Sequence, residues 1–496
     1  MGPPAEDAYD ELPYTDHAYA EAHPDRLAVV AALAGWSAPA VEAARVLELG
    51  CGRGGNLLPM AAAMPAATFV GVDRAARQID EARELARAAG LKNVTFHAAS
   101  FEDAPVGSGF DYVLCHGVAS WVPVTTRSAL FRAMTRALAP GGVGHASFNV
   151  LPGWYERLAA RDWLRFAAGH GAAPEGAPAA RRSLDWLRAR VTPERAEYKH
   201  SLDVVATRLA ETEEAYAAHE YLAAEHHPEH VATVLAEARA AGLAYLGDAI
   251  PQATAFELLD DETVARAETL APADAQQLVD FVTGASFRRA LFVRADAAGE
   301  RGWTWPLRLD ATALTRLRLA SRLVPESARD DGAAVERFRA GELTVEIADA
   351  GARRALHALA LAAPASLAWD EVARSVEGDV PPASLATELF ETWLATGALD
   401  LHAFAPKLAT FPSPRPRACA MARLRAARGG PLTNAWHHEV VLPASIARDV
   451  LALADGTRTD EELSAALAMH TLVSAERLAT VRASLVLLAS LGLLVD

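Results

Sequence analysis

Cysteine is scarce in this chain, and long apolar runs are missing. The 496 residues include only three cysteines, at positions 51, 115 and 419. Cysteines so far apart provide neither a disulfide framework nor the paired ligands of a zinc site. No uncharged apolar run approaches the roughly 20 residues that span a bilayer as a helix. We therefore expect a protein of the reducing cytoplasm without membrane insertion.

Excess positive charge is also lacking. Lys and Arg together number 47 against 63 Asp and Glu, and the formal net charge is −16. Tight binding to a phosphate backbone requires clustered positive charge, so we expect no nucleic-acid partner. The first residues, Met-Gly-Pro-Pro-Ala-Glu-Asp, lack the basic and apolar regions of a signal peptide. A length of 496 residues is enough for two to four domains, each able to bury a core.

A glycine-rich turn is the most informative segment. Residues 46–49 indicate a buried parallel strand, and the turn after it contains glycines at positions 50, 52, 54 and 55. Residues 57–63 continue as a short helix. Such a turn lets a ligand contact the backbone and the N–H groups at the helix start. The next apolar strand, residues 68–72, ends at Asp73, where a ribose diol would lie in a doubly wound sheet.

The order Glu-Leu-Gly-Cys-Gly at residues 48–52 resembles the class I S-adenosylmethionine (SAM) methyltransferases. Residues 110–116 look like their fourth strand, and residues 138–143 look like the turn before their fifth. A plain dinucleotide-binding domain is the alternative that such a turn leaves open. The resemblance implies SAM as cofactor and an α/β fold. It predicts a Rossmann-like, doubly wound SAM-binding domain followed by helical and winged-helix-like α+β domains.

In this family the cofactor contacts the turns that follow the first four strands. Ser100 occupies the place where an acid near the adenine amine is common, so that acid has moved to Glu102 or Asp103 or is replaced by backbone contacts. The resemblance implies cofactor contacts for Glu48, Gly50, Cys51, Gly52, Gly54, Asn56, Asp73, Arg74, Ser100, Phe101, Glu102, Cys115 and His116.

Further blocks narrow the resemblance to methyltransferases with a methyltransferase regulatory domain. These blocks are residues 116–123, 147–154, 219–222, 242–246, and 280–281 together with 287–289. The best-understood members look like bacterial protein-lysine methyltransferases acting on outer-membrane proteins, which implies a protein or peptide acceptor. The chain departs from its relatives at Ala119, where they often have an aromatic residue. It has no Asn-Pro-Pro-Tyr after the fourth strand, which enzymes that methylate nucleobase amines usually carry.

Candidate acceptor residues follow the fourth and fifth strands, at the edge of the sheet where ligands bind. We expect Trp121, Asn149 and Trp154 to line the acceptor pocket, with core packing as the alternative for the tryptophans. His116, Tyr14 or Tyr155 would orient the acceptor amine, although spacing requires none of them to be a base. Tyr14 and Tyr19 lie in the segment that often covers the SAM pocket in this family.

The histidine-rich segment 225–230 could suggest a metal site. Pro228 and Glu229 look instead like a helix start, and we expect no metal. His219 and Glu220 are expected to be a packing or interface pair.

The second half of the chain indicates small helical units with short strands. Residues 352–401 and 444–496 both end in a helix, a glycine and a short apolar strand, which suggests a winged-helix repeat. Residues 455–459 also resemble winged-helix modules that hold leader peptides in ribosomal-peptide biosynthesis. The expected domains are a lid or cap (1–34), a SAM-binding domain (35–155), a helical regulatory or dimerisation domain (156–300), a winged-helix-like middle domain (301–410) and a winged-helix-like C-terminal domain (411–496).

The sequence thus predicts methyl transfer from SAM to a protein or peptide side chain, with a lysine amine favoured. Residues 418–496 are expected to recognise the acceptor, and the first 417 residues are expected to bind SAM normally. The alternatives are a small-molecule methyltransferase whose extra domains only form a homodimer, a ribosomal-peptide methyltransferase, and a SAM-binding regulator without turnover.

Overall fold

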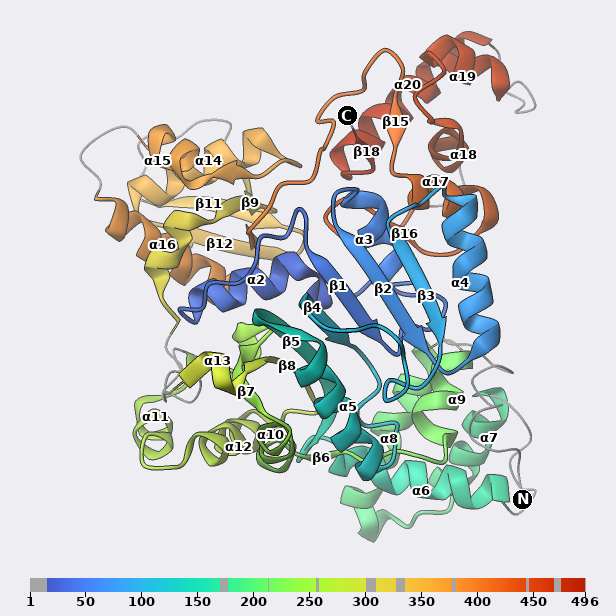
Figure 1. Ribbon diagram of the computed structural model, residues 1–496, viewed down its shortest axis with the longest axis vertical. Helices are drawn as coiled ribbons and strands as arrows, with labels where there is room; N and C mark the ends of the chain where they lie inside the picture. The colour runs from blue at the N-terminus through green and yellow to red at the C-terminus, as the bar shows by residue number, and fades with distance from the viewer. Residues whose placement is uncertain are drawn as a thin grey trace.

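A computed structural model describes residues 16–169, 177–212, 214–255, 258–299, 309–326, 335–376, 381–442, 446–467 and 474–495. A twisted sheet with the strand order β3-β2-β1-β4-β5-β8-β7 lies at its centre (Figure 1). The pairs from β3 to β5 are parallel, and β8 runs antiparallel to both neighbours. The strands are β1 (Arg45–Leu49), β2 (Thr68–Asp73), β3 (Val94–Ala98), β4 (Phe110–Cys115), β5 (Leu138–Leu151), β7 (Leu243–Asp248) and β8 (Phe287–Arg294).

The predicted Rossmann-like, doubly wound fold is confirmed. Helices α3 (Leu57–Ala63), α4 (Ala76–Ala88) and α5 (Val124–Ala137) connect the parallel strands, as their apolar periodicity predicts. The predicted turn at residues 138–143 belongs instead to β5, because Leu138 already pairs with Phe110 and the register shifts before Val143. The strands β7 and β8 lie within the range expected to be a helical domain, so the sheet draws on residues far beyond 155.

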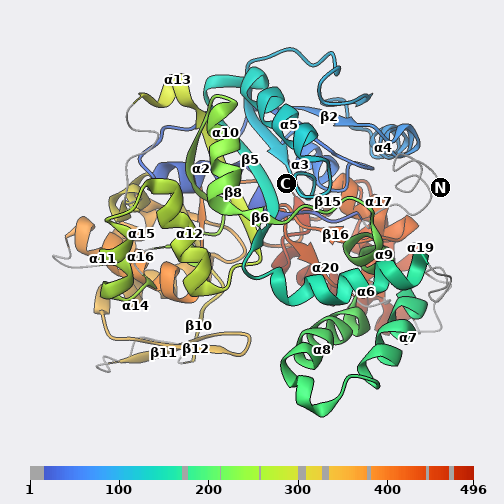
Figure 2. The same cartoon turned by 90° about the horizontal axis from the view of Figure 1, so that it is seen from below.

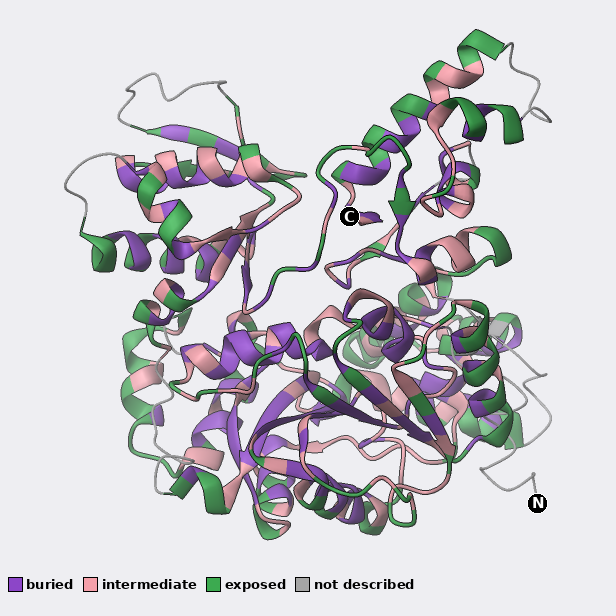
Figure 3. Ribbon diagram, turned by 45° about the horizontal axis from the view of Figure 1, so that its top comes forward, coloured by how far each residue is buried: buried purple, intermediate pink, exposed green. Residues whose placement is uncertain are grey.

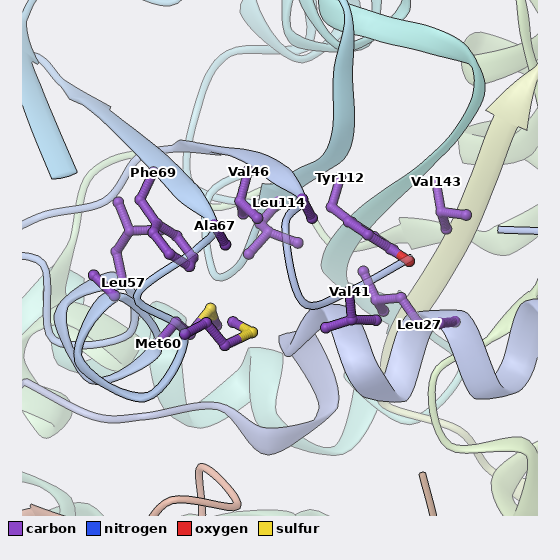
Figure 4. Close-up of a cluster of buried hydrophobic side chains, with 14 of the residues drawn as sticks. Leu27, Val41, Val46, Leu57, Met60, Ala67, Phe69, Tyr112, Leu114 and Val143 are labelled. Atoms are coloured by element: carbon purple, nitrogen blue, oxygen red, sulfur yellow. The ribbon is translucent and has the colours of Figure 1, made fainter. Parts of the chain in front are cut away.

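Apolar side chains from both faces of the sheet form the core of this domain. On one face, Val46, Phe69 and Leu114 pack against α3 and against α2 (Pro24–Leu33), as Figure 4 shows. Pro24 at the first turn of α2 suits a helix start, because its missing N–H would have no partner there. The inner strands β1, β4 and β5 are therefore buried along most of their length (Figure 3), as parallel strands covered on both faces require, whereas the edge strand β3 is mostly not buried.

A bundle of helices is inserted between β5 and β7. It consists of α6 (Tyr155–Gly169), α7 (Ala177–Arg188), α8 (Ala196–Glu211) and α9 (Glu214–Leu222), which form their own apolar core at one side of the molecule (Figure 2). The chain then returns to the sheet through β6 (Glu229–His230) and α10 (Val231–Ala240), which lead to β7, and α11 (Asp261–Ala267) and α12 (Pro272–Thr283) connect β7 to β8. Dimerisation through the helical region remains a prediction.

A buried ion pair explains part of the regulatory-domain motif. The Arg288 guanidinium in β8 lies 2.6 Å from the Asp280 carboxylate in α12, and both are almost fully buried. Arg288 also donates to the side chain and the carbonyl of Gln276. A buried charge is tolerated only when it is paired and hydrogen-bonded, so these residues fasten α12 to the edge of the sheet.

The middle domain has a small sheet of β13 (Leu367–Ala368), β9 (Arg318–Ser321) and β14 (Leu399–His402), with helices α14 (Ala350–Ala362), α15 (Trp369–Ser375) and α16 (Pro382–Thr396). Strands β10 (Val324–Pro325), β11 (Glu336–Ala340) and β12 (Leu343–Ile347) form a second, three-stranded sheet. Helix α16 ends at Gly397, whose φ of 60° is left-handed, before β14 begins. The expected order of helix, glycine and strand is therefore present.

The C-terminal domain has the same order of helix, glycine and strand. Helix α20 (Ser474–Ser490) is followed by Gly492, with φ of 68°, and by β18 (Leu494–Val495), which pairs with β15 (Arg417–Ala418). The other elements are α17 (Ala420–Arg428), β16 (Leu432–Thr433), β17 (Glu439–Val440), α18 (Ile446–Leu453) and α19 (Asp460–Ala466).

The C-terminal domain packs directly on the SAM-binding domain. Helix α17 lies beside α3 (Figure 1), and Met421, which is 2% exposed, belongs to the same apolar cluster as Leu57 and Met60. A chain that ends at residue 417 would cut β15 and uncover α3. That the first 417 residues bind SAM normally stays a prediction, and the core shared between the two domains weighs against it.

Candidate functional site

The glycine turn and Asp73 leave the sheet at the same edge. Leu49 pairs with Val72, and the N–H groups of Gly50 and Cys51 both donate to the Val72 carbonyl, at 2.8 and 3.1 Å. Gly50 has φ of 80° and faces Val118 so closely that a Cβ atom would collide with it. Only glycine fits such a position without strain.

Asp73 organises the turn. Its Oδ2 accepts the Gly52 N–H and its Oδ1 accepts the Ala75 N–H, each at 2.9 Å. A carboxylate oxygen can accept more than one hydrogen bond, so accepting these N–H groups does not by itself prevent Asp73 from accepting ribose hydroxyls. The role of Asp73 in cofactor binding stays a prediction that this geometry suits.

Glu48 and Asn56 form a buried pair under the turn. The Asn56 Nδ2 group donates to Glu48 Oε1 at 2.8 Å. The other oxygen, Oε2, is buried and has no hydrogen-bond partner among the described residues. Burial raises the pKa of Glu48 to about 8. A buried carboxylate with a free oxygen favours a cation, and the residues therefore fit SAM, which carries both an ammonium and a sulfonium group.

The remaining predicted cofactor residues surround this edge. Ser100 Oγ donates to Asp103 Oδ2 at 2.8 Å in the turn after β3, and Glu102 and Asp103 are both exposed. Burial raises the pKa of the Cys51 and Cys115 thiols, so small size accounts for them better than reactivity. Phe101 is partly buried, and Arg74 is exposed.

Tyr19 stacks on His116, with ring centroids 3.7 Å apart. The N-terminal segment therefore covers the turn after β4, whereas Tyr14 lies outside the described residues. His145 in β5 is stacked parallel to His116 at 5.9 Å, and both of its ring nitrogens are buried without a hydrogen-bond partner in the part of the chain that is described. Burial lowers the pKa of His116 and of His145 to about 3, so both rings are neutral. His145 was not predicted from the sequence, where a polar ring inside an apolar strand is its only signal.

A second aromatic cluster lies beyond the ends of β4 and β5. The His226 ring packs against Trp121 and Trp154, at centroid distances of 4.5 and 4.2 Å. The Asn149 Nδ2 group lies 3.0 Å from His226 Nε2. With the amide in this orientation Nε2 accepts, so the ring proton lies on Nδ1. Burial and nearby arginines, led by Arg161, lower the pKa of His226 to about 3.

The predicted acceptor residues are thus brought together, and His226 joins them. Trp154 is fully buried as the floor of this cluster, Trp121 is partly exposed, and Tyr155 is 54% exposed beside His230. Strand β6, residues 229–230, pairs with the end of β5, and this pairing places His226 beside Asn149. In the same segment, His227 bonds to Glu225 at 2.7 Å.

Three family models match the chain. They are the "Methyltransferase domain" over residues 46–142, the "Predicted methyltransferase regulatory domain" over residues 213–294, and the "PKMT, C-terminal winged helix domain" over residues 414–483. The first match ends inside β5, and the second includes the strands that complete the sheet. The third confirms the predicted winged-helix fold of the C-terminal domain.

Among sequence relatives, an uncharacterized protein of Rickettsia prowazekii is 35% identical over 299 residues, which are 58% of this chain and 53% of that protein. The alignment thus spans about half of that relative. A second protein of the same organism is 30% identical over 217 residues, 43% of this chain and 87% of that protein. Trans-aconitate 2-methyltransferase of Variovorax paradoxus is 34% identical over 106 residues, 21% of this chain and 38% of that enzyme.

A solved structure has the same fold as this chain. The structure of PKMT2 from Rickettsia typhi in complex with AdoHcy covers 98% of this chain and 100% of its own, with a TM-score of 0.83 at 21% identity. At this identity the likeness shows a shared fold. The sheet, the glycine turn and the family matches define a class I SAM-dependent methyltransferase, for which SAM is the methyl donor. The chain belongs to those members of the class that carry a methyltransferase regulatory domain. None of its described helices has the length and apolar character of a membrane span.

The raised pKa of Glu48 predicts a pH-dependent affinity for SAM. The free protein holds a proton on Glu48 below about pH 8, and a bound cation favours the carboxylate, so binding releases a proton. Affinity should then rise about tenfold per pH unit from pH 6 to 7 and level off near pH 8, where α-amino groups also deprotonate. Calorimetry at several pH values, in two buffers of different ionisation enthalpy, measures the pH dependence of the affinity and the proton release. Glu48→Gln should remove them, whereas the exposed Glu102→Gln should not; a flat profile for the native chain would contradict this role.

Proposed function

We propose that this protein transfers a methyl group from SAM to a protein side chain, with a lysine amine favoured. The observation that carries the proposal is the match of residues 414–483 to the PKMT winged-helix domain, a name that denotes protein-lysine methyltransferases. That domain packs on α3, the helix that follows the glycine turn, and so lies next to the expected donor site. The size of the chain outside the SAM-binding domain also favours a large acceptor.

The donor side of the reaction rests on residues of the sheet edge. SAM supplies a methyl group on a sulfonium that is already activated for displacement, so the protein mainly aligns and desolvates the reactants. The carboxylate of Asp73 would hold the ribose, and Glu48 would balance the positive charge of the methionyl end. Tyr19, stacked on His116, would exclude water from the turn after β4.

The acceptor side would lie at the cluster of Trp121, Trp154 and His226. A lysine must lose its proton before it can attack, and an apolar pocket lowers the pKa of an amine. The guanidinium of Arg161, 5.9 Å from the Trp121 ring, disfavours a second positive charge in the same way. His226 itself is neutral and would not serve as a base; its Nδ1–H would bind an oxygen of the acceptor polypeptide, which leaves the lone pair of the lysine amine free to attack the methyl group.

Methylation of a small carboxylic acid is the second candidate function. Two N–H donors of the cluster, His226 Nδ1 and Trp154 Nε1, are buried and have no partner within the described chain, and both suit a carboxylate oxygen. The similarity of the SAM-binding domain to trans-aconitate methyltransferases points the same way. Methyl esters hydrolyse in mild base, whereas N-methyl groups do not. Incubation with methyl-labelled SAM and cell extract should therefore yield base-stable label in protein, and base-labile label in small molecules would favour the second candidate.

Trp121→Ala is expected to separate donor binding from methyl transfer. Because Trp121 contacts His226 on the acceptor side, its loss should leave SAM affinity within about threefold while lowering kcat/KM for the acceptor by about tenfold or more. Calorimetry for SAM and initial rates for the acceptor give the two numbers. Trp186→Ala, a half-exposed tryptophan of the helical insertion, serves as the control. Equal losses of donor binding and of rate would place Trp121 in the donor pocket or the core.

A further inference from the structure

The C-terminal domain inserts one side chain beneath the glycine turn. His437 lies between β16 and β17, is 2% exposed, and has φ of 63°, the one positive value among the described residues other than glycine. Such a conformation persists only where the surroundings fix it. Asn434 does so, because its Oδ1 accepts the N–H groups of Trp436 and His438, at 3.0 and 2.9 Å, and its carbonyl accepts the His437 N–H.

The imidazole of His437 ends on the cofactor edge. Its Nε2 lies 2.8 Å from Asn56 Oδ1. Because Asn56 Nδ2 already donates to Glu48 Oε1, Oδ1 is the acceptor and His437 Nε2 carries the proton. The backbone N–H of Tyr19 donates to the same Oδ1 at 3.0 Å. The Asn56 amide is therefore held by three segments that are far apart in the sequence.

The same domain also holds the N-terminal segment that crosses the site. Arg425 lies 2.6 Å from Asp16, and Asp16 also pairs with Arg53 of the glycine turn, at 3.1 Å. Glu439 Oε1 accepts from His17 Nδ1 at 2.9 Å and from the Ala18 N–H at 3.2 Å. These contacts immediately precede Tyr19, whose ring covers His116. The C-terminal domain thus contacts both Asn56, next to the glycine turn, and the N-terminal segment whose Tyr19 covers His116.

We propose that His437 is a positioning residue of the cofactor site, supplied by the C-terminal domain. It fixes the Asn56 amide, and Asn56 in turn directs the free oxygen of Glu48 to the cationic ligand. The inference rests on the family's use of SAM and does not depend on which acceptor the protein methylates. Its consequence is reciprocal: anything that shifts the C-terminal domain changes SAM affinity, and bound SAM holds the domain in place.

Three substitutions in the full-length protein test this role. His437→Gly removes the imidazole and suits a positive φ, so folding should persist while the SAM dissociation constant rises about tenfold or more. His437→Gln keeps an N–H donor at the position of Nε2 and should recover affinity to within about threefold of the native value. Arg415→Gln, which removes an exposed contact to Glu462 inside the same domain, should leave affinity unchanged.

A double-mutant cycle distinguishes positioning from general loosening. If His437 acts through Asn56, His437→Gly combined with Asn56→Ala should bind SAM no more weakly than Asn56→Ala alone. The pH dependence of SAM affinity that Glu48 sets should also shift in His437→Gly. The proposal is overturned if folded His437→Gly binds SAM as the native chain does, if its effect adds fully to that of Asn56→Ala, or if affinity in all variants follows only the unfolding temperature.

Discussion

Replacing Gly52 with aspartate is expected to abolish measurable SAM binding. Gly52 has φ of 51°, and a Cβ atom there would lie 3.1 Å from Gln78 Oε1. The new carboxylate would also enter the edge that Asp73 and Glu48 already make acidic, where it would repel Asp73 and occupy the space of the methionyl group. Calorimetry with SAM measures the loss.

A matched glycine separates this effect from backbone strain. Gly107 has φ of 72° and no atom within 4 Å of an added Cβ, so Gly107→Asp carries the same left-handed strain away from the site. It should bind SAM normally. The SAM affinity of Asp73→Ala should lie between the affinities of these two variants, because losing a charged acceptor costs about 1.5–3 kcal/mol of binding free energy. Native SAM affinity in Gly52→Asp would show that the glycine turn is not the donor site.

Removing the residues after 417 is expected to destabilise the SAM-binding domain itself. The cut splits the β15–β18 pair and exposes the apolar surface of α3 that Met421 covers. Each large apolar side chain so uncovered forfeits about 1.5–3 kcal/mol, which for several contacts lowers the unfolding temperature by about 10 °C or more. Calorimetric melts of the two chains, with and without SAM, measure the effect.

Point variants on α17 provide the matched control for this truncation. Met421→Ala should cost about 2–5 kcal/mol, because it leaves a cavity in the shared core. Arg428→Ala, which removes an exposed pair with Glu84 from the same helix, should cost less than about 1 kcal/mol. If the truncated chain melts and binds SAM like the intact protein, the C-terminal domain is an independent module.

The strands and helices around the glycine turn could be predicted from local pattern. Apolar runs that end in Gly50 and Asp73 define parallel strands, and helix α3 begins and ends at the predicted residues. The fifth strand was predicted too short, because its first residues include Pro140, Gly141 and Gly142, which indicate a turn. The last two strands of the sheet were missed, because they follow an insertion of helices and alternate with them.

Some residues of the candidate site could likewise be predicted from the sequence, and others could not. Residues next to the strand ends, such as Asn149 and Trp121, could be placed from their position in the chain. His226 and His437 could not, since each approaches the sheet edge from a distant segment. His226 arrives through the pairing of β6 with β5, and His437 through the packing of α17 on α3. Their proximity is a consequence of tertiary structure, for which a single sequence carries no local signal.

Mass spectrometry of proteins from the native cell, with and without this enzyme, tests the central claim most directly. We expect at least one protein whose intact mass increases by whole methyl groups only when the enzyme is present. Peptide mapping should place those groups on lysine, and Gly52→Asp should abolish them. Identical protein masses in both cells, together with enzyme-dependent methylation of a small carboxylic acid, would contradict it.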